Sequence, residues 1–201
     1  MNRKKFPCQI VFIFFLTTIF TTPAWAGAPT DRIRQATDKI IEIVSDKALK
    51  EPGKKDERKM LIRKAVDEIF DWEDMSRRSL ARHWAKRTGE EKKEFIDLFG
   101  QLLERTYLKK VEGYSGEKVN YTGEKIDEDY GIVNVKIVTS KDVEIPVKYR
   151  LKKKESGWLV YDISIEGVSL IKNYRVQFNN IIRRSSYKKL VKRLRAKVEK
   201  E

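Results

Sequence analysis

The feature that most constrains the fold is a change of hydrophobic periodicity near Gly113. Before this residue, apolar side chains recur every three or four positions, as in amphipathic helices. After it they alternate with polar residues, most clearly from Val143 to Leu151, which is typical of a strand with one buried face. Helical spacing returns after Gly167. Helices, then consecutive antiparallel strands, then helices predict an α+β fold with a twisted sheet of about four strands.

The N-terminal part is predicted to form several helices. Thr30 or Asp31 is expected to cap the first helix, and Asp56 is expected to open the second. The strongest local signal is the stretch from Thr88 to Glu91, TGEE, because it has the form of a capping box. It predicts a long helix whose broad apolar face contains Phe95, Leu98, Phe99, Leu102, Leu103 and Tyr107.

Residues 119–151 are predicted to form three strands. The first is short and contains Val119 and Tyr121, and residues 123–131 then form a polar turn. Pro146 lies in the clearest strand and favours an edge position or a bulge, because proline has no backbone N–H to donate. The apolar faces of the second and third strands contain Val133, Val135, Ile137, Val143, Ile145, Val147, Tyr149 and Leu151.

The stretch Trp158–Phe178 is predicted to be a strand that leads into a helix. Its first part is rich in aromatic and β-branched residues. Ser169 is the expected N-cap of the helix that follows. The expected apolar face of the strand is Leu159, Tyr161, Ile163 and Ile165, and that of the helix is Leu170, Tyr174, Phe178, Ile181 and Ile182.

Met1–Ala26 has the three parts of an export signal. Arg3, Lys4 and Lys5 form a basic start, residues 10–20 form an apolar stretch, and Ala24-Trp25-Ala26 forms a small-x-small cleavage site. Cleavage after Ala26 and a periplasmic location are expected. Cys8 lies inside the signal, so the mature protein is expected to have no disulfide. Residues 27–201 are expected to form one domain.

The chain is strongly basic, with a formal net charge of +14 that falls to +11 without Arg3, Lys4 and Lys5. Such an excess suits nucleic acid, an anionic membrane surface, or solubility alone. Export argues against nucleic acid as a partner. Lysine and arginine are concentrated in residues 152–154 and in the predicted last helix, Ser186–Glu201.

Few residues are candidates for catalysis. His83 is the only histidine and has no cysteine partner, so we expect a structural role. Asp71, Glu73 and Asp74 follow Phe70 at a predicted helix boundary, where acidic side chains complement the helix dipole. Residues 127–129 are acidic but lack the ligand spacing of a calcium loop. The sequence therefore predicts a protein that is not an enzyme and has no metal or cofactor.

The stretch VYDISIEGVSLIKNYRVQFNNII, residues 160–182, resembles the signature of the MlaC (toluene-tolerance auxiliary) family. The stretches FDWEDMSRRSLARHW, TGEEKKEFIDLFGQLLERTYLKKVEGY and VKYRLKKKESGWLVYD follow the order and spacing of that family. Two positions differ from it: Leu80-Ala81 stands where Leu-Gly is usual, and Ser185-Ser186-Tyr187 occupies a turn that usually contains glycine. The resemblance covers nearly the whole mature chain.

The resemblance implies a periplasmic phospholipid carrier whose sheet and C-terminal helices enclose an apolar pocket. It also implies three partners: phospholipid, an inner-membrane lipid-transport ABC complex with its lipid-binding ring protein, and an outer-membrane lipoprotein–porin complex. The candidate lipid-binding residues are apolar and lie on the predicted sheet face and helices: Phe99, Leu103, Tyr107, Val133, Val135, Ile137, Val147, Tyr149, Leu151, Tyr161, Ile163, Val168, Tyr174 and Phe178.

The residues alone leave other functions open, because the same apolar side chains could fill a solid core. One alternative is an exported basic interaction module that docks anionic lipid or polymer. Another is a periplasmic hydrolase with a small apolar pocket.

Overall fold

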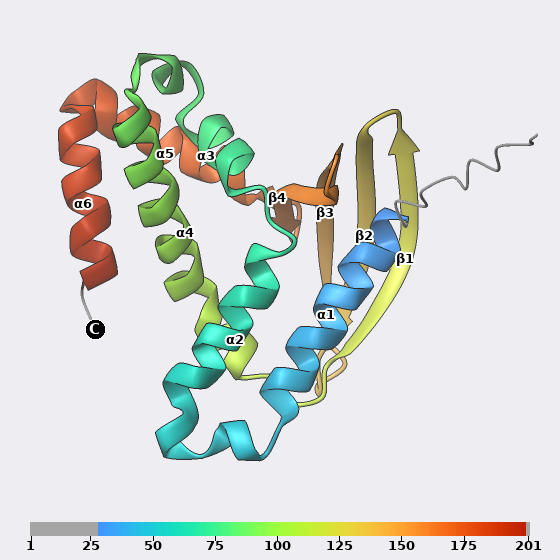
Figure 1. The fold of residues 1–201 in the computed structure, drawn as a ribbon. Helices are drawn as coiled ribbons and strands as arrows, with labels where there is room; N and C mark the ends of the chain where they lie inside the picture. Colours follow the sequence, from blue (N-terminus) through green and yellow to red (C-terminus); the bar gives the residue numbers. More distant parts are fainter. Residues whose placement is uncertain (1–27, 200–201) are drawn as a thin grey trace, which may run out of the picture.

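The computed structural model describes residues 28–199, so the predicted export signal lies outside the described residues. It confirms the α+β class, with helices before and after an antiparallel sheet (Figure 1). The α-helices are α1 (Pro29–Ser45), α2 (Lys55–Asp67), α3 (Trp72–Leu80), α4 (Gly89–Glu112), α5 (Leu170–Arg184) and α6 (Tyr187–Glu199). Short 3-10 helices are η1 (Ala48–Lys50), η2 (Pro52–Lys54) and η3 (Ala81–Lys86).

Helix starts follow local side-chain chemistry in most cases. The capping box is confirmed, since Thr88 and Glu91 each accept from the other's backbone N–H. Ser169 is confirmed as the N-cap of α5 and accepts from the backbone N–H of Lys172 at 3.0 Å. The expected cap of α1 is wrong: this helix begins at Pro29, and the Thr30 hydroxyl instead donates to the Glu124 carboxylate on the sheet.

The sheet has five antiparallel strands in the order β1-β2-β3-β4-β5. They are β1 (Lys118–Asp127), β2 (Tyr130–Val138), β3 (Glu144–Lys154), β4 (Gly157–Ile165) and the two-residue β5 (Val168–Ser169). The expected polar turn over residues 123–131 is wrong, because β1 extends to Asp127 and a two-residue turn connects it to β2. The end of β1 is exposed on both faces, so no alternation marks it as a strand.

Pro146 does not mark an edge, because β3 lies between β2 and β4. Its carbonyl accepts from the backbone N–H of Glu166 at 2.9 Å. The N and O of one residue face the same neighbour in an antiparallel strand, so the missing donor faces the turn just after β4. The last pair between these strands, Val147 with Ile165, precedes that turn. Proline is therefore tolerated at position 146, because its missing N–H lies beyond the last residue pair of β3 and β4.

A β-bulge at Tyr161 changes which side chains of β4 face the helices. Arg150 pairs with Asp162 and Leu151 pairs with Val160, so Tyr161 has no partner of its own on β3. A bulge places one extra residue in the strand and breaks the alternation of side chains there. The expected common face of Leu159, Tyr161, Ile163 and Ile165 is therefore wrong.

Two hydrophobic clusters form the interior. The sheet cluster packs α1 and the segment after α2 against the sheet and contains Ile33, Ile69, Val133, Val135, Val147, Leu151, Trp158 and Val160. The helix cluster packs α3, α4, α5 and α6 together and contains Met75, Leu80, Phe95, Leu98, Phe99, Leu102, Leu103, Ile171, Phe178, Tyr187, Leu190, Val191 and Leu194. Phe70 packs against both clusters.

Candidate functional site

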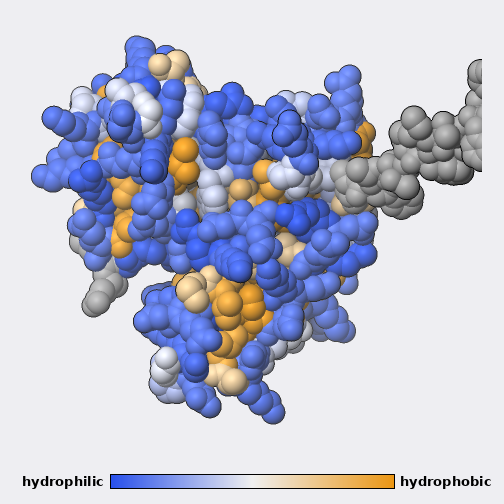
Figure 2. All heavy atoms as spheres, viewed as in Figure 1, coloured by the Kyte–Doolittle hydropathy of each residue, from blue (hydrophilic) through white to orange (hydrophobic). Residues whose placement is uncertain are grey.

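An apolar cavity of about 270 Å³ lies between the sheet and helices α1, α2 and α4. Its lining combines one face of the sheet with side chains from these helices. Figure 2 shows hydrophobic surface in the lower centre of the view, over α1 and α2. The residues that line the cavity are Ile33, Ala36, Thr37, Ile40, Ile62, Arg63, Val66, Ile69, Phe70, Trp72, Met75, Leu103, Glu104, Tyr107, Leu108, Val111, Ile137, Val147, Tyr149, Val160, Ile163, Ile165 and Leu170.

The structure brings six of the predicted site residues together around this cavity. They come from three strands and from α4: Leu103, Tyr107, Ile137, Val147, Tyr149 and Ile163. On the strands, they lie near the ends of β2 and β4 and the start of β3, which are adjacent in the antiparallel sheet.

The other eight predicted residues lie elsewhere. Phe99, Tyr174 and Phe178 pack against one another, with ring centroids 5.2–5.5 Å apart. Val133, Val135 and Leu151 fill the sheet cluster. Tyr161 lies under the guanidinium of Arg78, which is 4.0 Å from its ring centroid, and Val168 on β5 is exposed.

The cavity walls also differ from the expected ones, because the N-terminal helices form them. Of the two C-terminal helices, α5 contributes Leu170 and α6 contributes no lining residue. Both helices pack instead into the helix cluster against α4 and α3. Ile40 on α1 and Val66 on α2 line the cavity, but helical spacing of apolar residues could not show which part of each helix meets a cavity.

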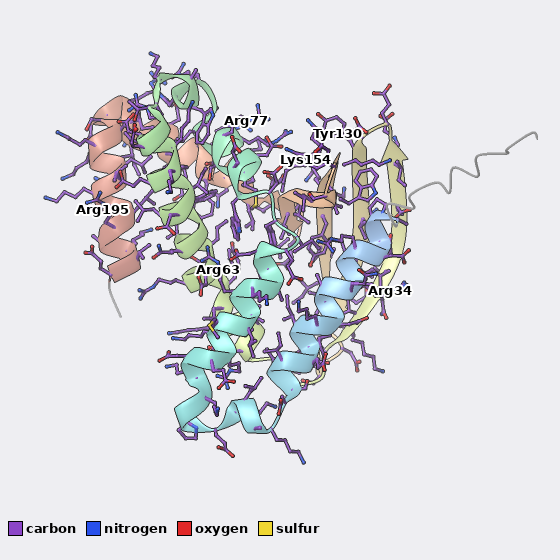
Figure 3. All side chains as sticks on the ribbon, viewed as in Figure 1. Arg34, Arg63, Arg77, Tyr130, Lys154 and Arg195 are labelled. Carbon is purple, nitrogen blue, oxygen red and sulfur yellow. The ribbon has the colours of Figure 1, made fainter. Side chains whose placement is uncertain are left out.

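Arg63 and Glu104 add charge to one edge of the cavity and were missed by the sequence reasoning. The Arg63 guanidinium donates to Glu104 on α4 at 2.6 Å and to Asp67 on α2 at 2.9 Å. Figure 3 shows Arg63 between α2 and α4. Arg58 and Glu112 form a second pair across the same helices at 3.0 Å. These two ion pairs join α2 to α4 beside the cavity.

Tyr149 lines the cavity on the sheet side, and its hydroxyl group is buried. Burial raises the pKa of Tyr149 to about 12, with a smaller contribution from Tyr121. Burial also raises the pKa of Tyr121, a neighbour of Tyr149 that does not itself line the cavity. Tyrosine is uncharged at physiological pH, so the Tyr149 end of the cavity suits an apolar group.

His83 and Asp71, which were considered as candidates for catalysis, make contacts that stabilise the fold. His83 Nε2 lies 3.0 Å from Asn179 Oδ1 on α5. Asp71 caps α3 by accepting from the backbone N–H of Asp74, as expected for an acidic residue at this boundary. Among residues 28–199, no group of three or more His, Cys, Asp or Glu side chains is placed to hold a metal ion.

The model of the MlaC protein family matches residues 34–196. The chain belongs to the MlaC family. The matched region runs from α1 to α6 and includes every residue that lines the cavity except Ile33. Within residues 28–199, no helix of this MlaC-family chain combines the length and apolarity needed to cross a bilayer.

Two similar proteins cover most of the MlaC-family chain. The intermembrane phospholipid transport system binding protein MlaC of Haemophilus influenzae is 21% identical over 178 residues, which cover 86% of this chain and 83% of that protein. The phospholipid-binding protein of Ralstonia solanacearum, solved in complex with a phospholipid, has a TM-score of 0.78 and 24% identity. That match covers 86% of this chain and 97% of the Ralstonia chain, and it shows that the fold is shared.

Proposed function

We propose that this protein is a periplasmic phospholipid carrier that holds acyl chains in the cavity between the sheet and α1, α2 and α4. The observation that carries the proposal is an apolar cavity in a chain of the MlaC family. The names of the Haemophilus and Ralstonia proteins, which refer to phospholipid transport and phospholipid binding, support it. Binding needs burial of the tails and no covalent step.

The energetics of lipid transfer require such a cavity. Two acyl chains have about thirty methylenes, and hiding them from water contributes about 24 kcal/mol at about 0.8 kcal/mol each. A lipid that leaves a bilayer loses this stabilisation unless the carrier replaces it. A cavity lined by the isoleucine, valine and aromatic side chains of the sheet and helices can do so, while the charged headgroup remains in water.

The size of the cavity implies that the walls move when lipid enters. Its volume of about 270 Å³ is below the range of about 300–1,000 Å³ for sites that hold drug-sized ligands. A two-chain lipid needs more room than this. We infer that α1 and α2 shift away from α4 and the sheet in the loaded protein, because these helices form the wall opposite the strands.

The proposed partners are an inner-membrane lipid-transport ABC complex with its lipid-binding ring protein, and an outer-membrane lipoprotein–porin complex. The carrier would receive lipid at one complex and deliver it at the other. Release of the exported chain into the periplasm requires removal of the signal Met1–Ala26, which leaves residues 27–201 as one domain. Intact-mass measurement of periplasmic protein should show a chain that starts at Gly27, and a retained N-terminus in the membrane fraction would contradict this.

Extraction tests the carrier function directly. Protein purified without detergent is extracted with organic solvent, and the extract is analysed by mass spectrometry. Phospholipid in stoichiometric amount is expected. Its absence, together with failure of the protein to take up phospholipid from vesicles, would instead favour a solid-core interaction module. Release of free fatty acid from the vesicles would indicate a hydrolase.

A further inference from the structure

The positive charge of the protein is concentrated at its C-terminal end. Residues 167–198 contain ten lysines and arginines and no aspartate or glutamate. Residues 27–166 have a formal net charge of only +2. Nearly all the excess charge of the mature chain therefore comes from α5 and α6.

Seven of these cations are exposed on α6 and on the adjoining end of α5. We call this the C-terminal basic surface; it consists of Arg183, Arg184, Lys188, Lys189, Lys192, Arg193 and Lys197, all exposed. The opposite side of α6, with Tyr187, Leu190, Val191 and Leu194, is buried in the helix cluster. Within residues 28–199, none of the seven cations lies within 4 Å of a carboxylate, whereas their neighbour Arg195, labelled in Figure 3, pairs with Glu94.

The sheet end of the molecule has little net charge. Residues 117–154, which include β1, β2 and β3, contain seven acidic and nine basic residues. Figure 1 places α6 at the left edge of the molecule and β1 at the right. The positive charge is therefore concentrated on the α6 side, and an anionic surface would attract the protein with α6 facing that surface.

We propose that the C-terminal basic surface docks the protein on an anionic phospholipid bilayer. Lysine supplies four of its seven cations, and no exposed aromatic residue lies among them. Protein–protein interfaces are depleted in lysine and enriched in aromatic residues, so this composition fits a diffuse charged surface better than an acidic protein. Since the apolar side of α6 is buried, the contact is electrostatic and peripheral, without insertion.

Vesicle co-sedimentation tests the proposal with charge-matched variants. One variant replaces Lys188, Lys189, Lys192 and Lys197 with Gln, a residue of similar helix propensity. The control variant replaces Lys47, Lys50, Lys141 and Lys153 with Gln, which removes the same charge from exposed positions far from α6 in sequence. Vesicles contain equal parts of phosphatidylglycerol and phosphatidylcholine, or phosphatidylcholine alone. Circular dichroism verifies that both variants are folded.

Wild type is expected to bind the anionic vesicles at low salt and to release them at about 1 M NaCl, where the Debye length is about 3 Å. Each basic residue at an anionic surface contributes about fivefold to partitioning, so the α6 variant should bind at least about 100-fold more weakly. The control variant should stay much closer to wild type.

Equal losses in both variants, or equal binding of wild type to neutral vesicles, would overturn the proposal. Unchanged vesicle binding by the α6 variant, with weaker retention on a polyglutamate resin, would assign the surface to an acidic protein instead. The inference does not require the cavity to hold lipid. A protein that binds vesicles but contains no extractable phospholipid would contradict the carrier function and leave this docking surface intact.

Discussion

Val135 and Val147 lie directly opposite each other across β2 and β3, yet they have different surroundings. Both belong to the sheet cluster, but only Val147 also lines the cavity, and Val135 is 2% exposed. The boundary between cavity and solid core therefore passes between two paired residues of the sheet. This pair separates the effect of filling the cavity from the effect of overpacking the core.

Val147→Trp is expected to give a folded protein that carries little lipid, because the indole occupies space needed by an acyl chain. The lipid-to-protein ratio is measured after solvent extraction, and melting is compared after delipidation, since bound ligand itself raises apparent stability. Val135→Trp is the control and should destabilise the fold by about 1–3 kcal/mol or more through overpacking. A Val147→Trp protein that unfolds, or that keeps a full lipid load, would argue against a lipid cavity at this position.

Glu104→Gln should lower the free energy of unfolding by about 1 kcal/mol. The side chains of Arg63 and Glu104 are 26% and 28% exposed, so their pair lies between exposed pairs at about 0.2–1 kcal/mol and buried pairs at about 3–5 kcal/mol. Arg63 also keeps Asp67 as a partner. Urea unfolding measures the change, and a double-mutant cycle with Arg63→Met isolates the coupling.

The control variant for this ion pair is Glu57→Gln, which removes the partner of Lys54 in an exposed pair at the start of α2. Its free energy of unfolding should fall by less than that of Glu104→Gln, because Glu57 contributes only an exposed ion pair and a charge in the first turn of α2. If both variants unfold alike, the ion pair between α2 and α4 does not stabilise the wall of the cavity.

Asp162→Asn should destabilise the protein by about 2 kcal/mol, because the buried carboxylate joins β4 to the start of α5. It accepts from the Ser169 hydroxyl at 2.7 Å and from the backbone N–H of Ile171 at 3.2 Å, and it pairs with Arg150 at 3.3 Å. Hydrogen bonds to charged groups contribute about 1.5–3 kcal/mol. Ser169→Ala removes one of these bonds and the helix cap, so a smaller loss of about 1 kcal/mol is expected. The reverse order in urea unfolding would contradict this role of Asp162.

Asp74 should make stability depend on acid pH. Burial by itself raises the pKa of Asp74, but hydrogen bonds from Arg78 and Arg77 outweigh burial and hold the pKa below its ordinary value of 3.8. Because the folded pKa is lower than the unfolded one, the contribution is complete above about pH 4 and is lost as the pH falls through the folded value. Asp74→Asn should therefore be less stable than wild type at pH 7, and the gap should narrow below about pH 4. A constant gap down to about pH 2 would refute the linkage.

Local chemistry made much of the fold predictable from sequence. Thr88, Glu91 and Ser169 act on backbone groups within three residues, so their caps could be identified without knowing the tertiary structure. Alternation likewise located β2 and β3, since one face of each strand is buried. The second half of β1, residues 123–127, was not predicted because its residues are exposed on both faces and leave no alternation.

The cavity was harder to predict because its position depends on contacts between distant elements. Phe99 and Leu103 are four residues apart on the same side of α4, yet Phe99 packs with Tyr174 and Leu103 lines the cavity. Helical spacing is the same for both. The bulge at Tyr161 is also a tertiary feature, and it moved this side chain away from Ile163.

The separation of the interior into a sheet cluster and a helix cluster affects the cooperativity of unfolding. With the cavity empty, part of the boundary between the clusters has no packed atoms, and Phe70 is one of the side chains that still bridge them. Segments with few packing contacts open at a lower free energy than the whole domain. Amide hydrogens of α1 and α2 should therefore exchange faster than those of α4 in delipidated protein, and this difference should shrink on loading. Bound phospholipid would then supply the packing contacts that the protein itself lacks between the two clusters.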